Sequence, residues 1–315
     1  MDVAIIILCW RHNGHLPALL QSIARQSARH RFVTVLCVNA KQGEIEPAAG
    51  WNAPPHHRIY SGGNFGYGGG NNFAIAWARQ KFDPRYFLVL NNDVVLTDGA
   101  LDALLSWADA RPALGIIGAV QTNPGDADSS PQIGCRYNPA FSLIRRTRMR
   151  DGGRIDYVNG GAVLLRATAF PDDPVFAERY FLFFEELELT LRARSMGHGT
   201  DCCPDCLVLH LEGATREGVV ADDFCPEVSE YFENLNALRF TRERYPRYLP
   251  SVLLFRLIVK FVRLVSRGEL KRLTFWYLAL ADFFRGRVRR FPFQRGWQPR
   301  DGRDAVIDAE LPCRP

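Results

Sequence analysis

The first two thirds of the chain alternate short apolar runs with segments in which apolar residues recur at helical spacing. This alternation is typical of a layered α/β sheet. We expect strands at residues 3–8, 32–38, 86–90, 115–120, 157–166 and 207–210, and helices at residues 16–28, 72–81, 101–110 and 183–196. The run at 86–90 is apolar throughout, so it should be a central strand whose carboxyl end lies where open α/β sheets bind their ligands.

Beyond about Glu227 the pattern becomes helical and stays so to roughly Arg290. We therefore predict an α/β domain over residues 1–226 and a helical, basic C-terminal extension over residues 227–315. Because 47% of the 315 residues are hydrophobic, the chain can bury a full core, which excludes disorder as its main state.

The N-terminus and the cysteines indicate a cytoplasmic protein. The apolar run that ends at Leu8 follows an acid, Asp2, and leads to no small-residue cleavage site, so it predicts a buried first strand rather than a signal peptide. Eight unevenly spaced cysteines fit a reducing compartment. Cys202, Cys203 and Cys206 lie close together, but no second Cys or His pair completes a zinc site, and we expect ordinary structural cysteines.

Positive charge gathers near the C-terminus, although the net charge is only +5. Basic residues recur every three or four positions from Arg256 to Lys271 among apolar ones, which predicts a basic amphipathic helix that is charged too often to span a bilayer. Such a helix can lie on an anionic inner leaflet, or it can pack on the α/β domain with a solvated basic face. Nucleic acid is disfavoured, because no reader motif accompanies the charge.

A glycine-rich stretch, residues 62–70, precedes the second predicted helix. Backbone without side chains lets a phosphate or a sugar approach closely, so we interpret this stretch as a ligand-binding loop. A dinucleotide fingerprint is the competing interpretation, but Asn71 stands where that motif needs its third glycine.

Two groups of acids follow apolar segments. Asp93 comes after the run at 86–90 with Asn91 on the same side, and these oxygens could bind a divalent cation or simply end the strand in a turn. Glu185, Glu186 and Glu188 follow the aromatic residues 180–184, whose apolar walls would raise a carboxylate pKa toward the range of a general base. Their alternative is a solvated helix N-terminus. His210, at a strand end, is by itself more typical of a structural histidine.

Taken in order, five segments resemble motifs of the family-2 glycosyltransferases of the GT-A fold, especially their rhamnosyltransferase-like bacterial branch. The likeness spans roughly residues 3–239. The five segments are residues 64–72 (Asn-Phe-Gly-Tyr-Gly-Gly-Gly-Asn-Asn), Asn91-Asn92-Asp93, residues 159–162 (Asn-Gly-Gly-Ala), residues 184–192 (Phe-Glu-Glu-Leu-Glu-Leu-Thr-Leu-Arg) and His210 with residues 213–215.

The resemblance implies a GT-A fold, which is a Rossmann-like and mostly parallel central sheet flanked by helices. It also implies transfer of a sugar, with inversion, from a nucleotide-diphosphate donor to a hydroxyl of a saccharide or lipid-linked acceptor in bacterial surface polysaccharide synthesis. Glu186 stands at the position of the catalytic base, and Asp93 with His210 would hold Mg²⁺ or Mn²⁺. Donor-side residues would be Trp10, Arg11, Asn39, Asn64, Gly66, Gly69, Asn71, Asn72 and Asn91. Acceptor-side residues would be Asn159, Gly160, Gly161, Glu185 and Arg192.

Three positions depart from the family pattern. The first two strands end in Cys9-Trp10-Arg11 and Val38-Asn39-Ala40-Lys41 where members have Thr-Tyr-Asn and Asp-Asn-Ala-Ser, which leaves uracil and thymine both open as the donor base. Glu186 replaces an Asp, which lengthens the reach of the base by one methylene. We expect the transferase to be peripheral to the inner face of the cytoplasmic membrane. The alternative is a non-catalytic sugar-nucleotide-binding or scaffolding subunit of the same pathway.

Overall fold

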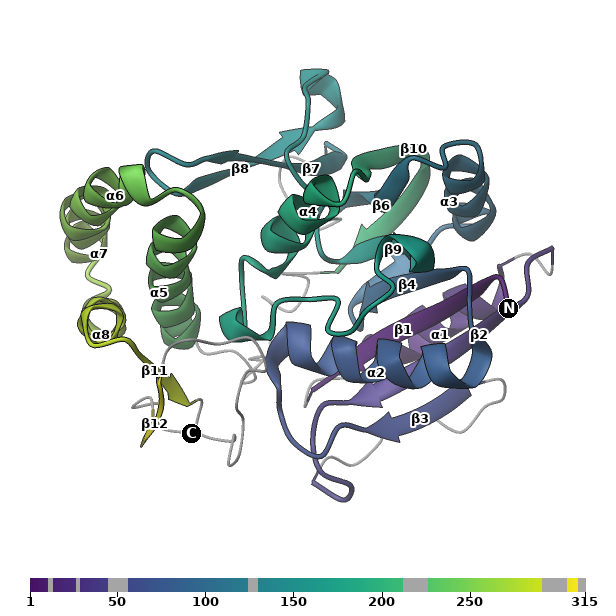
Figure 1. Cartoon of the computed structure of the whole chain (residues 1–315), viewed down its shortest axis with the longest axis horizontal. Coiled ribbons are helices and arrows are strands. Elements are labelled where there is room, and N and C mark those ends of the chain that lie inside the picture. The colour runs from purple at the N-terminus through teal and green to yellow at the C-terminus, as the bar shows by residue number, and fades with distance from the viewer. Residues whose placement is uncertain are drawn as a thin grey trace.

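The computed structural model describes residues 1–10, 14–26, 29–44, 56–123, 130–211, 226–290 and 305–310, which form one ten-stranded sheet, its helices and a helical C-terminal region (Figure 1). The strands of the sheet are β1 (Val3–Cys9), β2 (Phe32–Val38), β3 (His56–Tyr60), β4 (Tyr86–Asn91), β5 (Val94–Leu96), β6 (Leu114–Thr122), β7 (Gln132–Asn138), β8 (Leu143–Arg148), β9 (Ala162–Arg166) and β10 (Gly199–His210). The helices beside them are α1 (Leu16–Ala24), α2 (Gly66–Phe82), α3 (Ala100–Asp109) and α4 (Glu185–Ser195).

The sheet is mixed. Its order is β3-β2-β1-β4-β9-β6-β10-β5, with the hairpin β7–β8 attached to β6. Strands β3, β2, β1 and β4 are parallel, as are β6 and β10, whereas β9 is antiparallel to both of its neighbours. The parallel strands of the prediction therefore form one half of the sheet, and the other half is mixed, with mainly antiparallel pairs.

Helices cover both faces of the sheet, which explains the continuous apolar runs. Side chains of a strand alternate between faces, so Ile5 and Ile7 pack with α1 and α3 while Ala4 and Ile6 pack with α2 and α4. The predicted α/β architecture is confirmed, and β4 lies in the middle of the sheet as expected.

Several element boundaries differ from the prediction. Strand β3 and the hairpin β7–β8 were not predicted, because their sequences are polar or rich in arginine and lack an apolar run. Strand β9 begins only at Ala162, and β10 starts eight residues before Leu207 because a bulge between Cys203 and Leu207 interrupts its pattern. Cys202, Cys203 and Cys206 on β10 are buried free thiols, and burial raises the pKa of Cys202 to about 12.

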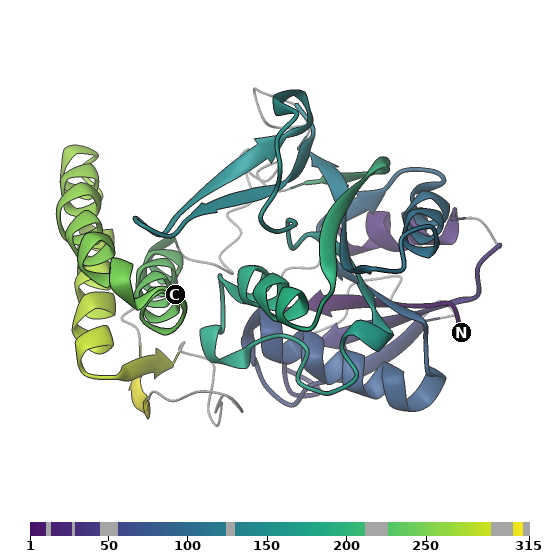
Figure 2. The ribbon, with the colours of Figure 1, turned by 45° about the horizontal axis from the view of Figure 1, so that its top comes forward.

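The C-terminal region is helical, as predicted, and lies to one side of the sheet (Figures 1 and 2). It contains α5 (Pro226–Arg244), α6 (Leu249–Phe255), the π-helical turn η6 (Arg256–Lys260), α7 (Phe261–Ser266) and α8 (Leu270–Phe284), followed by the short strands β11 (Arg287–Arg290) and β12 (Ala305–Glu310). Helices α5 and α8 enclose a core of their own around Tyr231, Leu235 and Phe275, which also receives Phe181. The division at residue 226 stays a prediction. Among the described helices, none is both long and apolar enough to cross a membrane.

Candidate active site

The glycine-rich stretch is irregular over residues 62–65, and its remaining residues, 66–70, are the first part of a helix. Helix α2 begins at Gly66, six residues before the predicted start. Gly66 has φ +71, and a Cβ there would lie 2.2 Å from the carbonyl oxygen of Phe181. A Cβ at Gly69 would lie 2.7 Å from that of Phe65, and one at Gly70 would lie 2.5 Å from Leu8. These glycines therefore let α2 pack closely against β1 and against the segment that leads into α4.

The turn that enters α2 is held by two asparagines of the predicted donor side. Nδ2 of Asn39 donates to Oδ1 of Asn64 at 3.1 Å and to the carbonyl of Gly66 at 3.0 Å. Oδ1 of Asn39 accepts from the amide of Phe65, and Oδ1 of Asn64 accepts from the amide of Gly66. Both side chains are buried, and these contacts are bonds within the fold.

The next two asparagines behave differently from each other. Asn72 donates to the carbonyl of Phe176 and to Glu178, and accepts from the amide of Phe176 at 2.8 Å. Asn71 donates to the carbonyl of Tyr67, but its Oδ1 is buried without a hydrogen-bond partner among the described residues. Trp10 is half-buried against the core of the C-terminal helices, and Arg11 lies outside the described residues.

A cavity of about 270 Å³ opens where the carboxyl ends of β4 and β6 meet the start of α4. It brings together seven of the predicted residues, which come from four separate segments of the sequence. They are Asn91, Asn159, Gly160, Gly161, Glu185, Glu186 and His210.

Glu186 is fitted against the segment before β9. A Cβ at Gly160 would lie 2.0 Å from Oε1 of Glu186, so only glycine leaves room for this carboxylate. Tyr67 of α2 donates its hydroxyl to the carbonyl of Gly160 at 2.8 Å. The neighbouring Gly161 makes room for Gln121 in the same way, because a Cβ there would lie 2.9 Å from the side-chain oxygen of Gln121. The two glycines thus leave room for two side chains that line the cavity.

Burial changes the acidity of the glutamates. It raises the pKa of Glu186, and burial together with the charge of Glu186 raises the pKa of Glu185 well above its usual value. Oε1 of Glu185 has no hydrogen-bond partner among the described residues. Glu188 has a different role, because it pairs with Arg179 at 2.8 Å and with Arg244. A carboxylate with a raised pKa is suited to accept a proton near neutral pH.

The backbone before α4 is strained. Phe181, Phe183 and Phe184 have φ values of 60, 68 and 77, a region that costs aromatic residues about 1–3 kcal/mol each. Helix α5 stabilises this conformation, because Nδ2 of Asn236 donates to the carbonyls of Tyr180 and Leu182 at 2.6 and 2.7 Å. The C-terminal region therefore helps to hold Glu185 and Glu186 at the cavity.

Asp93 and His210 lie side by side at the ends of neighbouring strands. Nε2 of His210 is 3.2 Å from Oδ1 of Asp93, an atom that is buried and accepts no well-directed hydrogen bond within the described chain. Burial raises the pKa of Asp93, but the contact with His210 outweighs it, and the net pKa is lowered. One oxygen and one nitrogen donor suit Mn²⁺ or Mg²⁺. The described residues hold no group of three such ligands.

Arg192 does not reach the cavity. Its guanidinium donates to the carbonyls of Pro174 and Val175 at 2.5 and 3.0 Å, beside a separate pocket. The cavity also contains residues that sequence reasoning missed, among them Tyr67, Gln121, Gln132, Arg146 and Phe183. The position of Gln121 near the carboxyl end of a strand was an available signal. Gln132 and Arg146 come from the unpredicted hairpin and carried none.

Known proteins resemble this chain in sequence and in fold. The model of a family described as glycosyltransferase like family 2 matches residues 1–224. The N-acetylglucosaminyl-diphospho-decaprenol L-rhamnosyltransferase of Mycobacterium tuberculosis is 27% identical over 231 residues, which cover 65% of this chain and 75% of that protein.

Two solved structures share the fold at low sequence identity. S. aureus TarS 1-349 in complex with UDP-GlcNAc superposes with a TM-score of 0.55 at 14% identity, over 90% of this chain and 81% of that one. GalNAc-T7 with UDP, GalNAc and Mn²⁺ superposes with a TM-score of 0.57 at 13% identity, over 79% of this chain and 49% of that one. The predicted GT-A fold is confirmed.

Proposed function

The chain belongs to glycosyltransferase family 2 and is a transferase, and we propose that it moves one sugar from a UDP- or dTDP-linked donor, with inversion, to an acceptor hydroxyl. The observation that carries this proposal is the cavity that Glu186, a carboxylate with a raised pKa, lines together with Asn91 and His210.

Glu186 is the proposed catalytic base. Its ionised carboxylate accepts the proton of the acceptor hydroxyl while the hydroxyl oxygen attacks the anomeric carbon of the donor sugar. The bond from that carbon to the diphosphate breaks, and the nucleoside diphosphate leaves with the electron pair. Asn159 and the backbone of Gly160 and Gly161 line the cavity beside Glu186, which supports an acceptor-side role for them.

Asp93 and His210 are the proposed ligands of Mg²⁺ or Mn²⁺. Oδ1 of Asp93 and Nε2 of His210 lie 3.2 Å apart, and together they would hold the cation beside the diphosphate of the donor. When bound, the cation would neutralise the charge that develops on the leaving diphosphate. The presence of Mn²⁺ in the GalNAc-T7 structure supports this choice. Asn71, whose buried Oδ1 has no partner among the described residues, is the best supported of the other donor-side residues.

The acceptor is proposed to be a saccharide or a lipid-linked saccharide of bacterial surface polysaccharide synthesis, with rhamnose among the candidate sugars. Support comes from the mycobacterial relative, whose name gives a decaprenol-linked acceptor and rhamnose transfer. We also propose that the protein works in the cytoplasm and contacts the inner face of the membrane through its C-terminal helices.

The test is binding of a panel of nucleoside diphosphates and their sugars, with and without Mn²⁺, to wild type and Asp93→Ala. We expect one UDP- or dTDP-sugar to bind tightly, and Asp93→Ala or metal removal to weaken that binding at least about a hundredfold, as loss of a charge-paired ligand implies. Circular dichroism checks that the variant is folded. If no nucleotide sugar binds wild type, with or without Mn²⁺, the proposed donor site is wrong.

A further inference from the structure

The helical stretch formed by α6, η6 and α7 buries an unusual set of side chains. The residues that it buries recur every four positions, and two of the four are cationic. They are Val252, Arg256, Lys260 and Leu264, of which Arg256 is 3% and Lys260 5% exposed. A helix on the surface of a water-soluble domain normally buries its apolar face and exposes its charges.

The outer side of the same stretch is apolar. Seven large hydrophobic residues between Leu254 and Val265 are each 44–58% exposed: Leu254, Leu257, Ile258, Val259, Phe261, Val262 and Val265. Single exposed apolar side chains are ordinary, but a contiguous row marks a surface that is covered by a partner or a membrane. This stretch therefore buries cationic side chains and exposes apolar ones, which is the reverse of an ordinary surface helix; we call it the inverted helix.

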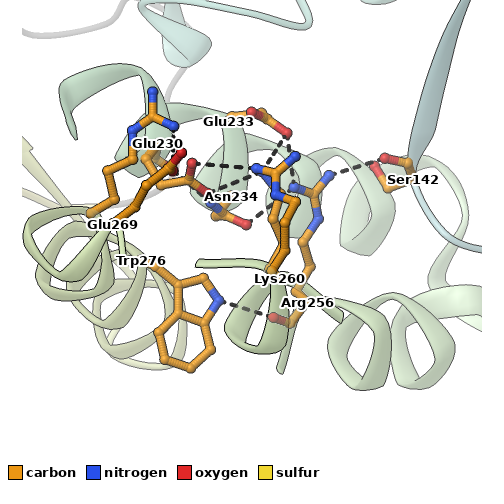
Figure 3. A network of polar contacts seen from close by, with 10 residues as sticks. Ser142, Glu230, Glu233, Asn234, Arg256, Lys260, Glu269 and Trp276 are labelled. Atoms are coloured by element: carbon orange, nitrogen blue, oxygen red, sulfur yellow. Dashed lines mark hydrogen bonds and ion pairs between the residues drawn. The ribbon is translucent and has the colours of Figure 1, made fainter. Parts of the chain in front are cut away.

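The buried cations are satisfied by α5, so the inversion is built into the fold (Figure 3). Arg256 contacts Glu233 at 3.2 Å and Asn234 at 3.1 Å, and Lys260 lies 3.0 Å from both Glu230 and Glu233. Leaving any of these buried charges unpaired would be costly, so the helix cannot simply rotate to hide its apolar side.

The same arginine connects this stretch to the hairpin β7–β8, whose turn reaches α6 in both ribbon views (Figures 1 and 2). Arg256 donates to the carbonyl of Ser142 at 3.0 Å, and the hydroxyl of Ser251 donates to the carbonyl of Ala140 at 2.5 Å. The rings of Phe141 and Phe255 are 5.8 Å apart. The hairpin turn and the helix thus form one continuous unit.

The hairpin turn extends the apolar surface. Phe141, Leu143 and Ile144 are 41–45% exposed. Exposed cations lie next to these segments in the sequence, with Arg145 beside Ile144 on β8, Arg267 directly after α7 and Lys271 in the first turn of α8. The nearby acid Glu269 is engaged with Arg272 at 2.6 Å. The surface is therefore both apolar and positively charged.

We infer that the outer side of residues 249–266 and the hairpin turn at residues 140–144 form a single docking face for an anionic lipid bilayer. An anionic leaflet offers apolar depth and negative charge together, which this surface matches. A second copy of the chain would bring like charges together across a two-fold axis. The far part of the hairpin contributes Gln132 and Arg146 to the cavity, so docking would hold the cavity near the membrane. The use of such docking, to bring the cavity to its acceptor, rests on the proposed lipid-linked acceptor.

The experiment is co-sedimentation of the whole chain with vesicles, without donor or acceptor. Wild type is compared on phosphatidylcholine alone and on equal parts of phosphatidylglycerol and phosphatidylcholine. The double variant Ile258→Glu with Val262→Glu places negative charge on the helical part of the docking face, and Ile144→Glu does so on the hairpin part. The variant Arg267→Gln with Lys271→Gln removes positive charge. Met196→Glu is the matched control, because Met196 is 41% exposed at the end of α4, outside the docking face.

We expect wild type and Met196→Glu to bind the anionic vesicles alike. The double glutamate variant should bind at least about tenfold more weakly, Ile144→Glu several-fold more weakly, and the charge variant roughly fivefold more weakly per residue removed. All variants change exposed positions and should keep the wild-type melting temperature. No binding by wild type, equal binding by the double variant, or a wild-type dimer that the double variant dissociates would each overturn the inference.

Transfer to a water-soluble saccharide acceptor separates this inference from the proposed function. The docking variants should transfer to such an acceptor at the wild-type rate, because none of the changed residues lines the cavity. If wild type transfers to no acceptor but still sediments with anionic vesicles, the proposed function fails and the docking face stands.

Discussion

The N-termini of α2 and α4 carry the two most distinctive polar motifs of the chain, and they use them in opposite ways. At α2, Asn39 and Asn72 employ both amide protons and the carbonyl oxygen in bonds to their own protein. At α4, Oε1 of Glu185 and the nearby Nδ2 of Asn159 are buried without hydrogen-bond partners among the described residues.

This difference separates what builds the fold from what is kept for a ligand. A buried polar group that lacks a partner costs about 1–3 kcal/mol, so its retention calls for a reason beyond folding. The hydrogen bonds of Asn39 and Asn72 bring a folding benefit that accounts for these two residues, whereas Asn71, whose buried Oδ1 has no partner among the described residues, belongs with the groups at α4. At α4, burial raises the pKa values of Glu185 and Glu186, the charge of Glu186 raises that of Glu185 further, and both residues line a cavity.

The largest effect expected from this comparison is on catalysis. Glu186→Gln should lower the transfer rate about 10²–10⁴-fold, because an amide cannot accept the proton of the acceptor hydroxyl. Steady-state transfer measures the rate, and donor binding should remain. Glu186→Asp is the matched variant, since it keeps a carboxylate and should retain part of the rate. A Gln variant as active as wild type would remove Glu186 from the mechanism.

The wild-type pH profile tests the same residue. The base works in its ionised form, and burial raises its pKa, so the rate should climb with pH through a value above the ordinary glutamate pKa of about 4.3. This rising limb should be measured as kcat against pH at saturating donor and acceptor. A rate already at its plateau at about pH 5 would contradict the assignment.

The next effect should fall on stability. Asn72→Ala removes three buried hydrogen bonds and leaves partners at Phe176 and Glu178 unsatisfied, which should lower the free energy of unfolding by about 3 kcal/mol. Urea denaturation measures the loss, with the exposed Asn138→Ala as its control. Donor affinity of the folded variant should be unchanged. Weakened donor binding at full stability would show that the contrast between the two helices is wrong.

The smallest expected effect is a gain in stability, in the variant Glu185→Gln. The raised pKa of Glu185 means that the folded state holds its proton to higher pH than the unfolded state, so this group makes stability fall as pH rises above the unfolded value. Glu185→Gln has no such dependence. It should exceed wild type by roughly 1–2 kcal/mol at neutral pH, with the difference shrinking toward about pH 4. A difference that does not vary with pH would argue against a buried, protonated Glu185.

The sequence by itself determined the local pattern of the fold. Strands β1, β2 and β4 and helix α3 follow from apolar runs and spacing. A strand that is covered by helices on both faces of the sheet must be apolar at every position, whatever its neighbours are. The candidates Asp93, Glu186 and His210 were also visible, since each stands where an apolar element ends or a helix begins.

Tertiary structure alone decided what those residues do. The contact of Glu186 with Gly160, the pairing of Asp93 with His210 and the entry of Arg146 into the cavity join segments far apart in the chain, and no local spacing encodes them. The same holds for the inverted helix. Its periodicity predicted an amphipathic helix, but only the acids of α5 decided that Arg256 and Lys260 face inward, because a buried cation lies where its counter-charge is.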